Sequence, residues 1–111
     1  MSEEKLICYV ASPLKNVLEL DNYTPKAWER VMELAENGCR AVKEMGYIPL
    51  SPVLLFAKVY CEESEREKAL KDGLALLGRC HCFYEVKSAY KSEGMQKERE
   101  VAKQLGLTLL N

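Results

Sequence analysis

Glu98 is the residue of this chain whose position most suggests chemistry. On a helical wheel at ~100° per residue, the segment after Ser92 gathers apolar residues on one side; these are Met95, Val101, Ala102 and Leu105. Glu98 falls in the middle of this apolar stripe. Burying an unpaired carboxylate is unfavourable, so the position requires a reason. Glu98 is either a structural residue that reaches solvent or pairs with a base, or a nucleophile or general base; spacing alone weighs these about equally.

The residues before Glu98 could hold an anion or a sugar. Ser92 can cap the helix, and Gly94 removes a side chain where a ligand could approach closely. Backbone N–H groups in a first helical turn lack intrahelical partners and favour a phosphate or a ribose hydroxyl. Simple capping by Ser92 needs no ligand. Desolvation should raise the pKa of Glu98 and the helix terminus should lower it; a nucleophile requires the second effect to prevail.

Cys80, His81 and Cys82 invite a metal interpretation. On a strand, Cys80 and Cys82 would share a face and His81 would point the other way. A closed zinc site usually needs four ligands, and this segment supplies too few. We therefore expect no metal. The chain also lacks a phosphate-binding loop and a dinucleotide fingerprint, so we expect no bound cofactor.

Apolar runs and turn residues predict the elements that position these side chains. Short strands are expected near residues 5–11, 47–50, 81–86 and 107–110. Helices are expected near residues 25–45, 65–78 and 92–105, the first capped by Thr24 and the second opened by a capping box at Ser64. Residues 12–24 are expected to form a polar connection, and residues 53–61 are ambiguous between a helical turn and an apolar loop.

The alternation of strands and helices predicts an α/β three-layer sandwich with a four-stranded parallel sheet. We expect the strand order 2-1-3-4. Ligands of such sheets bind beyond the carboxyl ends of the strands, where the order reverses. The crevice should therefore lie between Ser12-Pro13, after the first strand, and Ser92. We expect Glu98 to line it with Tyr9, Ser12 and the amides of Gly94 and Met95; these residues with Pro13 are the candidate binding set.

Composition limits the partners. The 111 residues suit one domain, 1–111, and 16 basic against 17 acidic residues argue against nucleic acid or an anionic membrane. We expect no signal peptide and no membrane span, hence a cytoplasmic protein with reduced cysteines. Trp28, Phe56 and Tyr60 offer apolar area for a homodimer or a multiple of one.

Four short motifs in order resemble the nucleoside 2-deoxyribosyltransferase superfamily, closest to its short bacterial and phage branch. They are YVASP at residues 9–13, GYIPLSP at 46–52, LALLGRCH at 74–81 and SEGMxxExxxAxxxG at 92–106. The resemblance covers nearly the whole chain and implies a flavodoxin-like (Rossmann-like) fold.

The resemblance also implies a chemistry. In that superfamily a glutamate attacks the anomeric carbon of a deoxyribonucleoside, the base leaves, and another base or water resolves the glycosyl-enzyme. Glu98 matches that glutamate, and Tyr9 matches a tyrosine lining the sugar and base. Ser92, Gly94 and Met95 match the segment that holds the sugar 5′ end or its phosphate. The resemblance also implies a dimer, because in that superfamily the neighbouring chain completes each pocket.

The chain departs from the superfamily pattern in its acids. The aspartate of the second helix falls at Gly73, with Asp72 one residue away as the candidate substitute. Another acid is replaced by Ser92, the usual aspartate of the third strand by His81, and a glycine before Pro13 by Ser12. The expected function is nucleoside or nucleotide N-glycosidic chemistry, by transfer or hydrolysis. The alternatives are a nucleotide-binding module without catalysis and a protein that binds no ligand.

Overall fold

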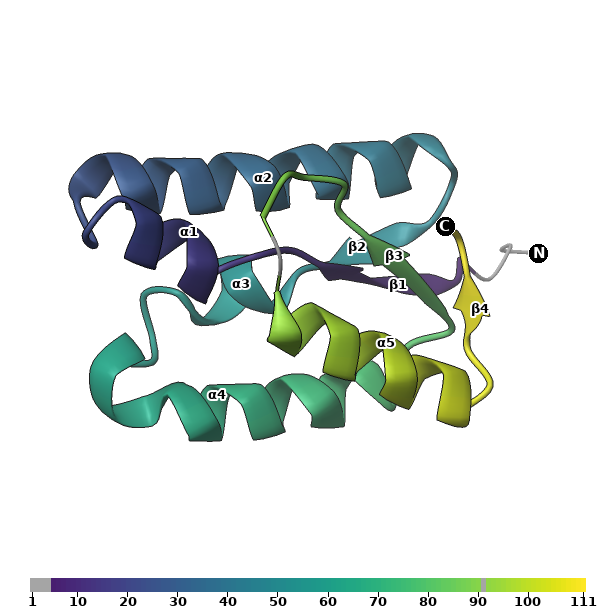
Figure 1. The fold of residues 1–111 in the computed structure, drawn as a ribbon. Helices are drawn as coiled ribbons and strands as arrows, with labels where there is room; N and C mark the ends of the chain where they lie inside the picture. The colour runs from purple at the N-terminus through teal and green to yellow at the C-terminus, as the bar shows by residue number, and fades with distance from the viewer. Residues whose placement is uncertain (1–4, 91) are drawn as a thin grey trace.

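Nine helices and strands make up the part of the chain that the computed structural model describes, residues 5–90 and 92–111. Figure 1 shows them along the chain. The strands are β1 (Ile7–Ala11), β2 (Ile48–Leu50), β3 (Cys82–Glu85) and β4 (Thr108–Leu109). The helices are α1 (Lys15–Leu20), α2 (Pro25–Glu44), α3 (Pro52–Phe56), α4 (Glu62–Leu77) and α5 (Glu93–Gln104).

The four strands form one parallel sheet in the order β2-β1-β3-β4, which confirms the predicted order. The central strand β1 pairs with β2 from Ile7 opposite Ile48, and with β3 from Cys8 opposite Cys82. The reversal of strand order therefore lies at β1 and β3. The carboxyl ends of these two strands define the edge where a ligand site is expected.

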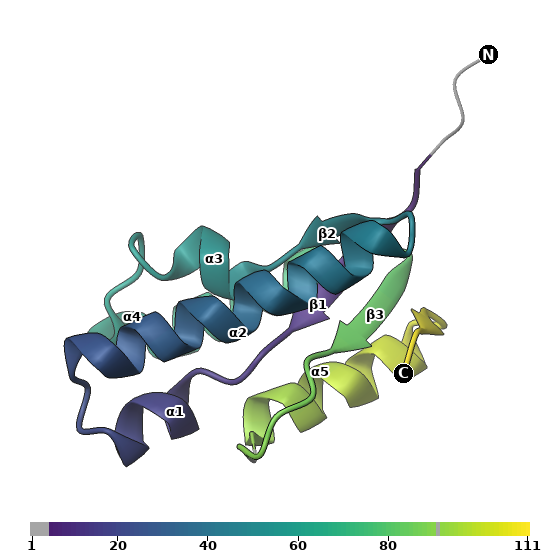
Figure 2. The same ribbon diagram turned by 90° about the horizontal axis from the view of Figure 1, so that it is seen from above.

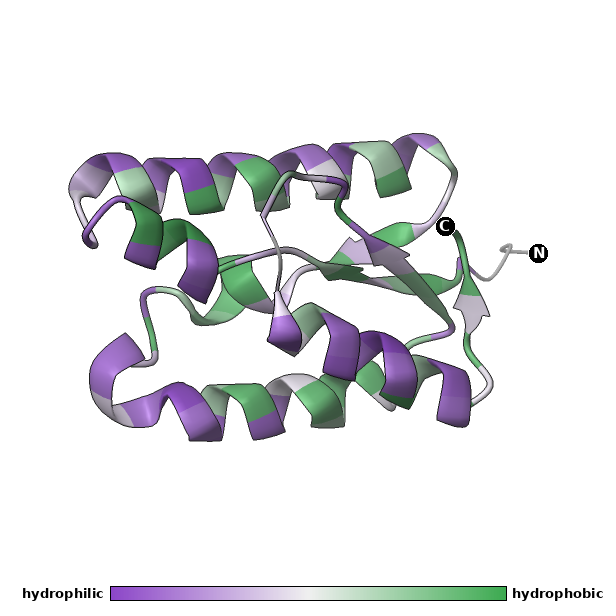
Figure 3. Ribbon diagram, viewed as in Figure 1, coloured by the Kyte–Doolittle hydropathy of each residue, from purple (hydrophilic) through white to green (hydrophobic). Residues whose placement is uncertain are grey.

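Helices cover both faces of the sheet. Alternate residues of β1 point to opposite faces, as the period of a strand requires. Cys8 and Val10 pack with the buried residues of α1 and α2, whereas Tyr9 and Ala11 pack with those of α4 and α5. Figure 2 shows α2 running along the sheet beside β1 and β2, and Figure 3 shows apolar residues on the helix faces turned toward the strands.

Residue types at the helix ends explain where the long helices begin. Thr24 and Ser92 cap α2 and α5, and their hydroxyl groups accept hydrogen bonds from the amides of Ala27 and Met95. Gly106, after α5, has a positive φ of 77°, which a residue without Cβ adopts most easily. The first turn of α5, which holds the candidate ligand segment, is therefore built as predicted.

The connections differ from the prediction. Residues 12–24 contain the helix α1, whose Val17 and Leu18 are buried, and the ambiguous segment begins with the short helix α3. The helix α4 begins after Cys61, not at Ser64, because the Glu65 carboxylate accepts a hydrogen bond from the Cys61 amide. No helix of residues 5–90 and 92–111 is long and apolar enough to cross a membrane.

Candidate functional site

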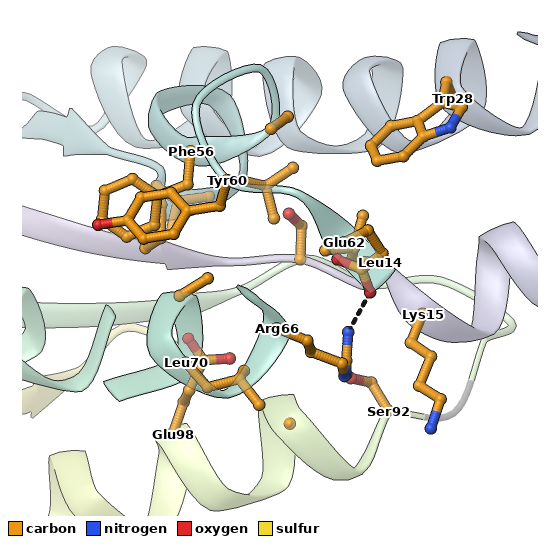
Figure 4. Close-up of a pocket in the computed structure, with 17 residues that line it drawn as sticks. Leu14, Lys15, Trp28, Phe56, Tyr60, Glu62, Arg66, Leu70, Ser92 and Glu98 are labelled. Atoms are coloured by element: carbon orange, nitrogen blue, oxygen red, sulfur yellow. Dashed lines mark hydrogen bonds and ion pairs between the residues drawn. The ribbon is translucent and has the colours of Figure 1, made fainter. Parts of the chain in front are cut away.

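A cavity opens beyond the carboxyl end of β1, where the strand order predicts a ligand site (Figure 4). The empty space in it is about 730 Å³, a volume that includes solvent at its open mouth. Its walls come from the end of β1, from all five helices and from the segments that join them. The residues that line it include Ser12, Lys15, Trp28, Phe56, Tyr60, Glu62, Arg66, Leu70, Ser92, Gly94 and Glu98.

Glu98 projects from the second turn of α5 toward the sheet and is bonded to Tyr9. The Tyr9 hydroxyl group donates a hydrogen bond to the Glu98 carboxylate. The Tyr9 ring is buried and stacks on Phe83 of the neighbouring strand, with ring centroids 6.0 Å apart and an interplanar angle of 12°. This packing fixes the hydroxyl group, and the hydroxyl group in turn orients the carboxylate. The structure thus places Tyr9 directly behind Glu98. Tyr9 itself is 1% exposed and is not among the residues that line the cavity, so the prediction that it lines the crevice is wrong.

Burial controls the protonation of this pair. Desolvation, and to a smaller extent the nearby charge of Glu85, raise the pKa of Glu98 to about 7, although the hydrogen bond from Tyr9 lowers it. Burial and the Glu98 charge also raise the pKa of Tyr9. For a nucleophile we expected the helix terminus and nearby hydroxyl groups to prevail. Removal of the carboxylate from water instead has the larger effect on its pKa, so only part of the Glu98 population is ionised near neutral pH. Glu98 is therefore poised to exchange a proton near neutral pH.

Asp72 does not lie beside Glu98. The Asp72 carboxylate accepts a hydrogen bond from the Tyr60 hydroxyl group, so it fastens the segment between α3 and α4. The next residue, Gly73, faces the site instead, and a Cβ atom built there would lie 3.3 Å from the Tyr9 hydroxyl oxygen. The shift by one residue rotates the acid out of the site, as ~100° per residue requires. The prediction that Asp72 substitutes for the missing acid is not supported by this geometry.

The remaining predicted residues divide into two groups. Ser12, Ser92 and Gly94 line the cavity with Glu98. Pro13 is fully buried, and Met95 packs in the core between α5 and the sheet, with its amide already bonded to the Ser92 hydroxyl group. The Met95 amide is therefore not available to a ligand.

Ser12 has an unsatisfied hydroxyl group. The residue is 7% exposed, and its Oγ atom has no hydrogen-bond partner among the described residues. Buried hydroxyl groups normally have a partner, because an unpaired one loses its bonds to water without replacement. Since Ser12 lines the cavity, a ligand could supply that partner.

Several lining residues were not predicted to belong to the site. Trp28, Phe56 and Tyr60 line the cavity, although the sequence suggested a contact with a second copy. The ion pair between Arg66 and Glu62 also lines it, with Nη1 and Oε1 2.6 Å apart. The spacing of these two charges, four residues apart on one helix, is a detectable signal, but it is equally typical of a solvated helix surface.

The cysteine and histidine segment is structural. The His81 Nδ1 atom accepts a hydrogen bond from the Ile7 amide at the start of β1. Cys80 packs on the face of Tyr9 and Cys82 on the opposite face with Cys8, so the expected shared face is wrong. The reason is that β3 begins only at Cys82. Among the residues that the structure describes, no group of three or more potential ligands could hold a metal ion.

Comparison with known proteins places the chain in a family. Residues 6–111 match the family described as Domain of unknown function (DUF7768). The chain belongs to this family. No match to a curated protein was found. The family description carries no activity, so the function must be argued from the geometry of the cavity.

Proposed function

We propose that this member of the DUF7768 family acts on the N-glycosidic bond of a nucleoside or nucleotide, with Glu98 as the nucleophile. The observation that carries the proposal is the bond of Glu98 to Tyr9 at the wall of a mixed cavity. In Figure 4, Phe56 and Tyr60 lie toward one end of that cavity, and Lys15 and Ser92 lie toward the other. A base could stack at the aromatic end, and a polar group could bind at the cationic end.

The proposed reaction proceeds in two steps. The Glu98 carboxylate attacks the anomeric carbon, the carbon–nitrogen bond breaks, and the base leaves with the electron pair and takes a proton from water. Water or a second base then attacks the same carbon and gives up a proton to the hydroxide left by the first step, while the bond to the Glu98 carboxylate breaks and the carboxylate is released. Only the ionised carboxylate is a nucleophile. The hydrogen bond from Tyr9 favours that form and makes Tyr9 a positioning residue.

The test is turnover of a panel of ribonucleosides, deoxyribonucleosides and their 5′-monophosphates, followed by release of the free base. We expect Glu98→Ala and Glu98→Gln to abolish base release, because neither side chain can form the glycosyl ester. Glu100→Gln is the matched control, since Glu100 is exposed on the same helix and does not line the cavity. Equal turnover by the wild type and Glu98→Gln would exclude the nucleophile.

A second candidate function is a nucleotide-binding module without catalysis. It is favoured by Gly73, which leaves the position beside Tyr9 without an acid to protonate the departing base. Such a module would bind a nucleotide in the same cavity without releasing base, and Glu98 would accept a hydrogen bond from a sugar hydroxyl group. Binding of a nucleotide by the wild type without turnover of any panel member would support this function and exclude the first.

We further propose that the protein works in the cytosol as a homodimer. Leu54, Leu55 and Val59, in and after α3, expose apolar side chains at 38%, 53% and 72%. Neighbouring exposed apolar residues of this kind are typical of surfaces that associate. The five cysteines are free, as expected of thiols in a reducing compartment.

A further inference from the structure

The ion pair of Arg66 with Glu62 stands apart from the other ion pairs of the described residues. The other four join atoms 3.5 to 3.8 Å apart, whereas Nη1 of Arg66 and Oε1 of Glu62 are 2.6 Å apart. Both side chains are largely covered, at 29% and 16% exposure, and both line the cavity. A solvated helix surface does not require such a contact, because exposed pairs of this spacing contribute little to stability.

Donors for an anion surround this pair. Lys15 lines the same cavity. A second hollow shares Lys15, Arg66, Ser92 and Gly94 with this cavity and adds Lys97, together with the carboxylates of Glu19 and Glu93. The helix α5 contains twelve residues, and its first turn faces both hollows through Ser92 and Gly94. The positive end of the helix dipole, Arg66 and Lys97 favour an anion with several oxygen atoms, whereas Lys15 is paired with Glu19 at 3.7 Å.

The unsatisfied Ser12 hydroxyl group is independent evidence for a ligand at this place. It lines the cavity, is more than nine-tenths buried and has no partner among the described residues. Neither Glu62 nor Arg66 bonds to it. A ligand in the cavity that carries several oxygen atoms could accept a hydrogen bond from this hydroxyl group as well as from the Arg66 fork.

Arg66 has donors to spare. Its contact with Glu62 uses Nη1, and no other hydrogen bond of the Arg66 side chain is found within residues 5–90 and 92–111. A guanidinium group carries five N–H donors in a fork that matches carboxylate and phosphate oxygens alike. The Glu62 carboxylate therefore occupies part of a site that a phosphate could fill more completely.

We propose that Arg66 binds the 5′ phosphate of a nucleotide, and that Glu62 is its resident counter-ion, which the phosphate displaces. This inference rests on the proposed function for the identity of the ligand, and it names the 5′-monophosphate rather than the nucleoside as the substrate class. Glu62 competes with the ligand for Arg66. The apparent affinity for phosphate is therefore reduced in proportion to the fraction of molecules in which Arg66 is free of Glu62. It also keeps the guanidinium group paired when no anion is bound.

The experiment measures binding of inorganic phosphate, a 2′-deoxynucleoside and its 5′-monophosphate by calorimetry. We expect Glu62→Gln to tighten phosphate and monophosphate binding about threefold to tenfold, because the competitor loses its charge. Glu63→Gln is the matched control; it removes the same charge from the same helical turn but does not line the cavity, and its effect should stay below about twofold. Arg66→Gln should abolish the preference for the monophosphate over the nucleoside.

The outcomes separate this inference from the proposed function. Weaker monophosphate binding by Glu62→Gln, equal effects of Glu62→Gln and Glu63→Gln, or an unchanged preference in Arg66→Gln would each overturn the inference. No binding of phosphate or monophosphate by the wild type would also overturn it. Base release from nucleosides as fast as from monophosphates would leave the proposed function standing and exclude the phosphate site. Phosphate binding with the expected variant effects but no base release would leave the phosphate site standing and exclude the proposed reaction.

Discussion

The carboxyl group of Glu98 is subject to two opposing effects at the residue scale. Burial disfavours its charged form, and the hydrogen bond from Tyr9 favours it. Burial has the larger effect, so the pKa rises from 4.5 to about 7. A group with this pKa changes its protonation state within the physiological range, and this change should be visible in the stability of the protein as well as in any activity.

We predict that Glu98→Gln removes a pH-dependent loss of stability. A raised pKa in the folded state means that the native protein holds a proton that the unfolded chain releases between pH 4.5 and about 7. Stability of the wild type should therefore fall over that range and level off above it, by roughly 1–3 kcal/mol in the free energy of unfolding. Glu98→Gln lacks this titration. Urea unfolding at pH values of about 4, 6 and 8 measures the difference.

The control for this measurement is Glu100→Gln, whose exposed carboxyl group belongs to the same helix. Its difference from the wild type should stay nearly constant with pH. Parallel stability curves for the wild type and Glu98→Gln would show that Glu98 is solvated in solution. A wild type that gains stability relative to Glu98→Gln as the pH rises would show that Glu98 is paired with a cation.

The sequence predicted part of the site at this scale because Glu98 breaks a pattern. A carboxylate in an apolar stripe is visible on a helical wheel, and Tyr9 follows from the strand order. Arg66 and Glu62 break no pattern, since charged residues four apart on a helix are normally solvated. Their place in the cavity depends on how α4 packs beside α5, which short-range spacing does not encode. Asp72 was assigned to the site because it is next to Gly73 in sequence. A shift of one residue along a helix is enough to point its side chain away from Glu98.

At the scale of elements, the long helices and the strands were predictable and the short helices were not. Apolar spacing and caps locate α2 and α5 within a few residues. The helices α1 and α3, of six and five residues, are too short for a helical period to develop, and α3 buries none of its residues. Both help to wall the cavity, so the missed elements are part of the candidate site.

The packing of α2 on the sheet depends on Gly38. A Cβ atom built there would lie 2.4 Å from Cγ2 of Val86 and 2.8 Å from Cγ1 of Val10, so the helix approaches the sheet more closely than a side chain permits. We predict that Gly38→Ala lowers the free energy of unfolding by about 1–3 kcal/mol through overpacking, despite the better helix propensity of alanine. Urea unfolding measures this loss.

Gly78→Ala is the matched control for Gly38→Ala. A Cβ atom at Gly78, at the end of α4, would make ordinary contacts of 3.5 Å or more. Its stability should stay within about 0.5 kcal/mol of the wild type. Equal stability of Gly38→Ala and the wild type would mean that α2 can move away from the sheet without loss, and the close packing would then not be a constraint on the fold.

At the scale of the whole molecule, the order of the strands determined where the cavity lies. Alternating strands and helices predict a parallel sheet, and the order 2-1-3-4 brings the end of β1 beside the end of β3. This much follows from the pattern of the chain. The shape of the cavity does not, because it depends on how Trp28 of α2, Phe56 of the short helix α3 and Tyr60 of the following connection meet in the complete fold.

We predict that the protein associates through a surface outside the cavity, formed by α3 and the residues after it. Leu54, Leu55 and Val59 leave 38%, 53% and 72% of their side chains in contact with water, although neighbouring residues of the same segment wall the cavity. Covering such side chains is favourable by about 25 cal/mol per Å². Light scattering at tens of micromolar should therefore give twice the chain mass of 12.7 kDa.

The variant Leu55→Glu should lower the measured mass to that of one chain with an unchanged circular dichroism spectrum, since a charge is costly in an apolar interface. Leu20→Glu, which changes an α1 residue that is 75% exposed, should leave the mass unchanged. A wild type with the mass of one chain at this concentration, or equal effects of the two variants, would show that α3 faces water and that the cavity is complete within one copy.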